Sequence, residues 1–188
     1  MIKGIINYSH HLLEESVAPG DTVVDATCGN GHDTLFLSKL TGEQGKVLAF
    51  DIQRQAIQNT KQLLQKHNCN NVELILDDHA HLSDYLTIDH QAQIGGAIFN
   101  LGYLPGGDKS VITTASSTII ALDTVLLSLK KGGLLILVIY PGHPGGQEEK
   151  EAVLKHVIQL DQSFFNVLQY RFINQKNNPP FIVAVEKK

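Results

Sequence analysis

The chain has 188 residues, of which 43% are hydrophobic and 18% charged, a balance that predicts one globular domain with a sizeable core and excludes a disordered protein. Its formal net charge of −4 argues against the broad basic surface of non-specific nucleic-acid binders, but allows a small local patch for a structured RNA. The apolar runs are far shorter than the roughly 20 residues of a membrane-spanning helix. The N-terminus lacks the apolar stretch of a signal peptide, and Cys28 and Cys69 are too few for a disulfide framework and are not spaced for zinc. We therefore expect a cytoplasmic protein without a membrane segment or a metal site.

Apolar segments of strand length alternate along the chain with segments of helical period. The predicted strands are 21–26, 46–51, 72–77, 94–100 and 133–140. The predicted helices are 9–17, 33–40, 53–67, 80–86, 114–130 and 147–160. The fifth helix is expected to end at Lys130, because lysines followed by glycines are a common helix stop. This alternation predicts a parallel sheet with helices on both faces.

The end of the chain departs from this pattern. Two further apolar segments, 164–173 and 181–188, are separated only by the turn-rich link 174–180. That link has no room for a crossover helix, so the two strands must be antiparallel. We therefore predict a single α/β domain over residues 1–188, with a mostly parallel seven-stranded sheet, a C-terminal antiparallel hairpin and helices on both faces.

The segment VVDATCGNGHDT (23–34) joins the first predicted strand to the following helix and contains two glycines two positions apart. This context is typical of a nucleotide-binding turn, because glycines let the backbone approach a ligand and the helix N-terminus presents free N–H groups. A dinucleotide-binding turn would carry a third glycine at position 34, where this chain has Thr34. Asp25 would also place a second anion against a pyrophosphate. We therefore expect a ligand with a cationic centre.

Acidic residues lie at the ends of the next two predicted strands. Asp51 ends the strand 46–51, where a carboxylate can accept hydrogen bonds from both hydroxyls of a ribose. Asp78 follows the third strand and is placed to accept from an adenine amino group. Together with Asp25 and the glycine turn, these acids describe a pocket for an adenosine whose other end is an amino acid. We therefore expect S-adenosylmethionine as the cofactor.

Each of these elements also has a purely structural interpretation. The glycine turn could be a tight corner, and Asp51 and Asp78 could cap the helices that follow them. Cys28 is interpreted as a small residue that fills the turn rather than as a nucleophile. From other functional classes, the alternatives are an oxidoreductase that binds NAD through Asp51 and a non-catalytic adenosine-binding module. The missing third glycine and Asp25 argue against the oxidoreductase.

The segment FNLGYLPGGDK (99–109) follows the fourth predicted strand, where a substrate would meet the cofactor. Its Asn100, Tyr103 and Pro105 are similar to the Asn-Pro-Pro-Tyr arrangement of enzymes that methylate nitrogen atoms on bases. In that arrangement an amide oxygen accepts from the target amine and an aromatic ring packs on the substrate. A glycine- and proline-rich loop with an asparagine at its corner is the structural alternative. We favour the functional interpretation, because a polar residue that ends an apolar strand needs a hydrogen-bond partner. An intact loop of this kind also argues against a non-catalytic adenosine-binding module.

Three segments, VDATCGNGHDT (24–34), FNLGYLPGGDK (99–109) and YPGHPGGQEE (140–149), together resemble the bacterial family labelled "putative rRNA methylase". This family is associated with the tRNA methyltransferase that converts 5-aminomethyl-2-thiouridine to its methylaminomethyl form at the wobble position. The resemblance covers nearly the whole chain. It implies a Rossmann-like class I methyltransferase that uses S-adenosylmethionine and acts on the anticodon loop of tRNA. An rRNA base or a small metabolite is the alternative substrate.

The motifs and the resemblance together define the expected site. The expected catalytic residues are Asn100, Tyr103 and His10. By its spacing from the Asp25 strand, His10 fits the family's single histidine better than His11 does. His32 and His143 are further candidates for a base. The expected cofactor-binding residues are Asp25, Thr27, Gly29, Asn30, Gly31, His32, Asp33, Asp51, Gln53, Asp78, His79 and Asn100. The expected substrate-binding residues are Leu101, Gly102, Tyr103, Tyr140 and His143. Lys109, Arg171 and Lys176 are candidates to contact an RNA backbone, and a homodimer is left open.

Overall fold

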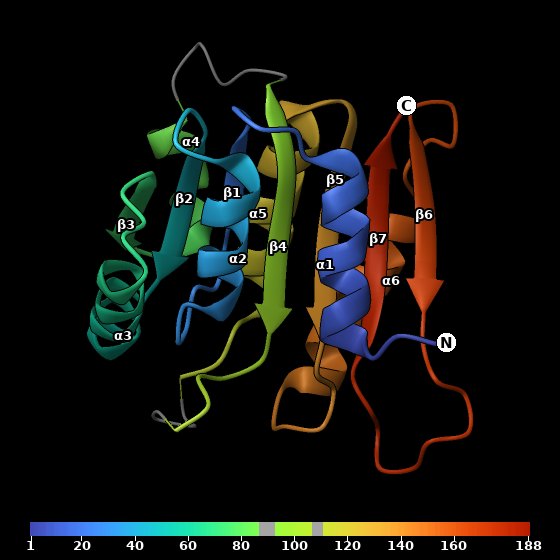
Figure 1. Ribbon diagram of the computed structural model, residues 1–188. Helices are drawn as coiled ribbons and strands as arrows, with labels where there is room; N and C mark the ends of the chain where they lie inside the picture. Colours follow the sequence, from blue (N-terminus) through green and yellow to red (C-terminus); the bar gives the residue numbers. More distant parts are fainter. Residues whose placement is uncertain (87–92, 107–110) are drawn as a thin grey trace.

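The computed structural model describes residues 1–86, 93–106 and 111–188. Within them, seven strands form one sheet in the order β3-β2-β1-β4-β5-β7-β6 (Figure 1). The strands are β1 (Thr22–Asp25), β2 (Lys46–Asp51), β3 (Val72–Leu76), β4 (Ile94–Leu101), β5 (Leu129–Ile139), β6 (Phe165–Tyr170) and β7 (Phe181–Lys187). Neighbours from β3 to β5 pair in parallel, whereas β7 pairs antiparallel with both β5 and β6. The predicted parallel sheet with a C-terminal antiparallel hairpin is confirmed.

Helices cover both faces of this sheet (Figure 1). They are α1 (Ile5–Ser16), α2 (His32–Thr41), α3 (Arg54–Lys66), the short 3₁₀ turn η1 (His79–His81), α4 (Leu82–Tyr85), α5 (Ala115–Ser128) and α6 (Gly146–Ile158). One apolar cluster joins Val23 and its neighbours to α1 and α2, and a second joins Val24 and its neighbours to α5 and α6. Successive strand residues thus point into two separate cores. This double burial explains why the strands are continuous apolar runs in the sequence.

Two predicted helix boundaries are wrong. The first helix begins at Ile5 rather than at residue 9. Its N-cap residue is Gly4, which has no side chain to cap the helix and so gives no sequence signal for its start. The fifth helix ends at Ser128, and the lysines and glycines expected to close it lie inside β5. Leu129 pairs with Ile94 of β4, so β5 begins as soon as the helix ends. Sheet pairing therefore overrides the local helix-stop signal.

The strand order reverses between β1 and β4, which are neighbours in the sheet although β2 and β3 lie between them in the chain. In open α/β sheets, ligands bind outside the carboxyl ends of the strands at such a switch point. The loops after β1 and β4 are joined here, since the Asn100 backbone N–H donates to Thr27 Oγ1 at 2.7 Å. The fold thus brings the glycine turn and the loop after β4 to one edge of the sheet.

Candidate active site

A cavity of about 970 Å³ opens at this switch point. It brings together most of the residues that the sequence predicts for the site: Thr27, Gly29, Asn30, His32, Asp33, Asp51, Gln53, Asp78, His79, Asn100, Gly102, Tyr103, Tyr140 and His143. Four predicted residues do not line it, namely His10, Asp25, Gly31 and Leu101. Leu101 is fully buried in the apolar core. The other three support the cavity wall from behind, as their contacts show.

The glycine turn after β1 requires its two glycines. Gly29 and Gly31 have φ angles of 53° and 84°, a region in which side chains other than glycine's are strained. A Cβ atom at Gly31 would also lie 2.9 Å from the Cα of Thr60 in α3. Gly31 is the N-cap of α2, and no side chain caps this helix end. The turn therefore brings the backbone and the first N–H groups of α2 to the cavity.

Asp25 is expected from the sequence to bind the cofactor, but it lies beneath the turn and does not line the cavity. Its Oδ2 accepts a 2.6 Å hydrogen bond from Thr34 Oγ1, and its Oδ1 accepts from the Thr27 backbone N–H at 3.2 Å. The side chain is fully buried. Burial, followed by the charge of Asp33, raises the pKa of the Asp25 carboxyl from 3.8 to about 7. Thr34, at the position of a dinucleotide site's third glycine, thus serves as the hydrogen-bond donor to a buried acid.

Asp51 and Asp78 both cap local structure and line the cavity. Asp51 Oδ2 accepts from the Gly29 N–H at 3.0 Å, and Oδ1 accepts from the Gln53 N–H at 2.9 Å. Asp78 Oδ1 accepts from the Ala80 N–H at 2.9 Å. A carboxylate offers about four lone-pair sites, so these bonds leave capacity for a ligand. The structural and the ligand-binding interpretations are therefore compatible for both acids.

His79 contributes a neutral imidazole to the wall beside Asp78. The ring is buried, and its Nδ1 lies 3.1 Å from the Ala26 carbonyl oxygen. Burial lowers the pKa of this imidazole below its usual value. The contact with a carbonyl requires Nδ1 to carry the hydrogen, which leaves Nε2 as the unprotonated nitrogen. The ring also packs edge-on against Phe99 at 5.6 Å.

One carboxylate links the predicted catalytic residues His10 and Asn100. Asp33 Oδ1 lies 2.6 Å from His10 Nε2, and Asp33 Oδ2 accepts from Asn100 Nδ2 at 2.7 Å. The His10 ring stacks on Phe36 with centroids 3.9 Å apart, which fixes its orientation. Because a carboxylate only accepts hydrogen bonds, the amide NH₂ of Asn100 must face Asp33. Asn100 lines the cavity, and its amide oxygen is thereby left to accept a hydrogen bond from a ligand.

The charge of the cavity favours a cation. Its lining includes the four carboxylates of Asp33, Asp51, Asp77 and Asp78, and among the described lining residues there is neither a lysine nor an arginine. An anionic pyrophosphate would meet these acids without a compensating charge. A positively charged sulfonium is suited to the same surroundings. The electrostatics therefore argue against a dinucleotide and favour S-adenosylmethionine.

Two tyrosines, Asn30 and Cys28 complete the described surroundings of the cavity. Burial raises the pKa of Tyr140, so its phenol stays protonated, and Tyr103 lies edge-on to His143 at 6.0 Å. Asn30 links the glycine turn to the loop after β4 by donating to the Pro105 carbonyl at 3.3 Å. Burial also raises the pKa of the Cys28 thiol, which makes it a poor nucleophile. Within the described residues, no group of three or more His, Cys, Asp or Glu side chains could hold a metal ion.

Sequence reasoning missed part of the cavity wall. Ile6 of α1 and Asn178 and Pro180 of the β6–β7 link all line it. The link was interpreted only as a connection between strands, although Asn177 and Asn178 adopt positive φ angles that mark a shaped turn. Lys176 does not line this cavity, and Lys109 lies outside the described residues.

Comparison with known proteins identifies the chain's relatives. A family model described as "Putative rRNA methylase" matches residues 47–186. The chain belongs to this family. A solved structure of a "putative rRNA-methylase" from Clostridium thermocellum is 45% identical and covers 100% of both chains with a TM-score of 0.95. A "putative methyltransferase" from Streptococcus mutans, solved in complex with SAH, is 44% identical with full coverage of both chains and a TM-score of 0.91.

A curated relative from Arabidopsis thaliana is named "tRNA (mnm(5)s(2)U34)-methyltransferase, chloroplastic". The two sequences are 37% identical over an alignment of 191 residues, which covers 96% of this chain and 68% of the relative. The rRNA methylase family, the fold and the SAH-bound neighbour establish this protein as a class I methyltransferase with S-adenosylmethionine as its cofactor. None of its described helices is long and apolar enough to cross a membrane.

The residues present fit this cofactor. We propose that Asp51 accepts from the ribose, that Asp78 accepts from the adenine amine and that the turn 27–31 receives the amino-acid end. When bound, S-adenosylmethionine supplies an electrophilic methyl group on a sulfonium. The acids around the cavity provide the negative potential that such a cation requires.

Replacing Asp51 by alanine is expected to weaken S-adenosylmethionine binding by about 1–3 kcal/mol, the usual scale for removing hydrogen bonds to a charged group. Calorimetric titration measures this change. Asp51→Asn keeps one acceptor oxygen for the Gly29 or the Gln53 N–H, so it should lose less affinity than Asp51→Ala if part of the loss comes from turn support. Asp123→Ala is the matched control, because this exposed acid pairs with His156 away from the cavity. Unchanged affinity in Asp51→Ala would remove Asp51 from the binding site.

Proposed function

We propose that this protein methylates the primary amine of 5-aminomethyl-2-thiouridine at the wobble position of tRNA, forming the 5-methylaminomethyl derivative. The hydrogen bond between Asn100 Nδ2 and Asp33 carries the proposal, because it turns the Asn100 amide oxygen toward a donor such as an amine N–H. The Arabidopsis relative, named as a tRNA (mnm(5)s(2)U34)-methyltransferase, supports the choice of substrate.

The chemistry requires a neutral amine. A primary aliphatic amine has a solution pKa near 10.4, so only about one molecule in a thousand is neutral at pH 7. The cavity acts on this equilibrium in two directions, since enclosure favours the neutral form whereas the nearby acids favour the ammonium. An amide oxygen accepts one amine N–H without adding charge. Asn100 can therefore orient the nitrogen so that its lone pair points at the methyl carbon.

The reaction balances without a further reactant. A carbon–nitrogen bond forms as the carbon–sulfur bond breaks, and one proton leaves the nitrogen. Of the candidate bases, His10 is held by Asp33 at 2.6 Å and by its stack on Phe36. Because that carboxylate also holds Asn100, the imidazole and the amide are fixed by one side chain. We assign Asn100 to orient the amine and Asp33 to position both neighbours; because His10 lies behind Asp33 and does not line the cavity, a proton reaches its imidazole only through that carboxylate.

Tyr103 and Tyr140 supply the walls for the base itself. Tyr103 is 41% exposed and lines the cavity, so it lies where a nucleotide would enter from solvent. Tyr140 also lines the cavity and lies next to Gly102, since a Cβ atom added at that glycine would lie 3.6 Å from the Tyr140 Cβ. Aromatic side chains commonly stack on unpaired RNA bases. These rings are therefore suited to hold an extruded uridine.

Methylation in vitro of two tRNA samples tests the proposal. We expect incorporation of a labelled methyl group into tRNA that carries 5-aminomethyl-2-thiouridine and none into an unmodified transcript of the same sequence. Nucleoside mass spectrometry of the product should show the methylaminomethyl derivative. Equal incorporation into the transcript, or incorporation only into rRNA or a small metabolite, would overturn the assignment.

A further inference from the structure

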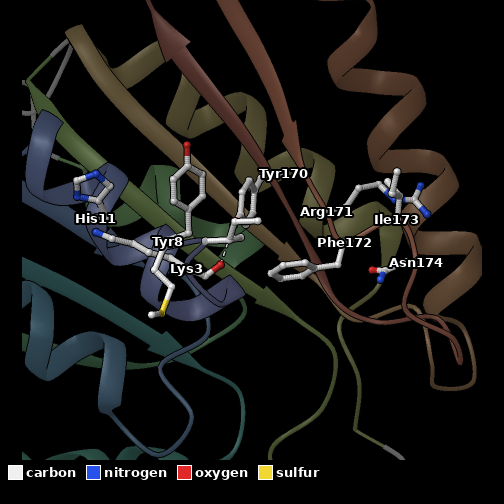
Figure 2. Close-up of a pocket in the computed structure, with 10 residues that line it drawn as sticks. Lys3, Tyr8, His11, Tyr170, Arg171, Phe172, Ile173 and Asn174 are labelled. Carbon is white, nitrogen blue, oxygen red and sulfur yellow. Dashed lines mark hydrogen bonds between the residues drawn. The ribbon is translucent and has the colours of Figure 1, made fainter.

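A second hollow, of about 590 Å³, lies between the start of the chain, α1 and the segment after β6 (Figure 2). We call it the aromatic groove and define it by Lys3, Tyr8, His11, Tyr170, Arg171 and Phe172, which are among the residues that line it. The residues that we have assigned to methyl transfer do not line it. The groove therefore needs an explanation of its own.

The rings in this groove form a fixed, partly exposed platform. The Tyr8 and Tyr170 centroids lie 4.1 Å apart, and Phe172 lies edge-on to Tyr170 at 5.8 Å. The Tyr170 hydroxyl donates to the Lys3 carbonyl at 2.7 Å, which ties the N-terminal segment to β6. In Figure 2 the rings of Tyr8, Tyr170 and Phe172 lie on the α1 side of the segment, with Arg171 and Ile173 beyond them. Such a platform presents aromatic faces without a cost for ordering them.

The charge of the groove is opposite to that of the cavity. Lys3 and Arg171 lie in its lining, and none of the lining residues is Asp or Glu. Arg171 is one of only two arginines in the chain. The cavity has four carboxylates and no Lys or Arg in its described lining. An RNA backbone is therefore repelled at the cavity and attracted at the groove.

The groove and the cavity are built by the same two segments. From α1, Ile6 lines the cavity and Tyr8 lines the groove. From the β6–β7 link, Asn178 lines the cavity and Asn174 lines the groove. Figure 1 shows this link at the same edge of the sheet as the segment that follows β4. A polynucleotide can therefore occupy the groove while one of its nucleotides enters the cavity.

We infer that the aromatic groove binds unpaired nucleotides of the RNA substrate that flank the methylated one, with bases on the rings and phosphates near Lys3 and Arg171. The identity of this RNA as a tRNA anticodon loop rests on the proposed function. Stacking on aromatic side chains and pairing of phosphates with basic groups are the two general means of binding single-stranded RNA. An acidic protein can thereby bind RNA through a small local site.

Fluorescence anisotropy with a labelled anticodon stem–loop RNA, in the presence of saturating S-adenosylhomocysteine, tests the inference. Phe172→Ala should weaken RNA binding about tenfold, the effect of removing one base stack. Phe164→Ala is the matched control, because Phe164 is 62% exposed at the opposite end of β6. The double variant Lys3→Gln/Arg171→Gln should make the slope of log affinity against log salt shallower by about 1.4, or about 0.7 for each phosphate that is no longer neutralised. Lys61→Gln/Lys66→Gln, on exposed positions of α3, is its control.

The outcomes separate this inference from the proposed function. If wild-type protein methylates the aminomethyl tRNA but the groove variants bind the stem–loop like wild type, the groove inference fails and the function stands. If the groove variants lose RNA affinity while wild-type protein leaves that tRNA unmethylated, the function fails and the groove inference stands. Absence of RNA binding by wild-type protein overturns the groove inference. So does a dimer in sedimentation that Phe172→Ala dissociates without a change in RNA affinity.

Discussion

Replacement of Asn100 by alanine is expected to lower kcat for tRNA methylation about a hundredfold while the affinity for S-adenosylmethionine stays within a factor of about three. The amide oxygen is the group assigned to orient the amine, and misplacement of a reacting group by about 1 Å costs rates of this order. Single-turnover kinetics at saturating tRNA measure the rate, and calorimetry measures the affinity. A loss confined to kcat identifies an interaction that acts on the reacting amine rather than on cofactor binding.

Two further variants make the result specific to the amide. Asn100→Asp retains an oxygen but would place a second carboxylate against Asp33, where Nδ2 now donates at 2.7 Å. Repulsion between the two acids should turn the side chain away, so this variant should not rescue activity. Asn166→Ala removes an exposed asparagine on β6 that bonds Glu186, and activity should stay at the wild-type level. Wild-type kcat in Asn100→Ala would make the loop after β4 a structural element only.

The arrangement of the strands could be predicted because each parallel strand is buried on both faces. Val23 and Val24 enter opposite cores, so β1 is apolar at successive positions, and the same holds for β2 and β4. The boundaries that failed depend on pairing and packing between distant residues. Leu129 belongs to β5 because Ile94 pairs with it, and local sequence gives no sign of that partner. The start of α1 at Ile5 depends likewise on the packing of Ile5 against the core that contains Val23.

The site could be predicted where a residue's role follows from its place at a strand end. Asp51, Asp78 and Asn100 lie at or just beyond the carboxyl ends of strands that share one edge of the sheet, and all three line the cavity. The hydrogen bonds of Asp33 with His10 and Asn100 could not be predicted, since they join residues 23 and 67 positions apart. The position of Asp25 could not be predicted either, because the same acid that suits a cationic ligand can also be buried by its neighbour Thr34.

The carboxylates of the cavity and the basic residues of the groove lie in separate places, and the two sites that we propose depend on this separation. Acids gather at the cavity, where S-adenosylmethionine brings a positive charge. The basic residues of the groove lie where phosphates are expected. Net charge alone therefore underestimates RNA binding by a protein of this kind, because a local patch decides where the backbone lies.

Asp25 is expected to cost the protein stability at neutral pH, so Asp25→Asn should be the more stable form there. The pKa of this carboxyl rises from 3.8 to about 7 in the folded state, mainly through burial. The fold therefore favours the protonated acid. Between about pH 4 and pH 7 the unfolded chain has released this proton while the folded protein keeps it, so stability falls as pH rises. Above about pH 7 both states are ionised and the contribution no longer changes.

Urea unfolding of Asp25→Asn and wild type across pH 4 to 8 measures this effect. The difference in unfolding free energy should grow in favour of the variant by up to about 4 kcal/mol, since one pKa unit corresponds to about 1.4 kcal/mol. Glu43→Gln, at an exposed acid between α2 and β2, serves as the control and should show no such growth. A cationic ligand above the turn favours the ionised acid, so wild-type affinity for S-adenosylmethionine should rise relative to that of Asp25→Asn as pH passes through about 7. Parallel affinity profiles would show that Asp25 supports the turn without contributing to the potential at the sulfonium.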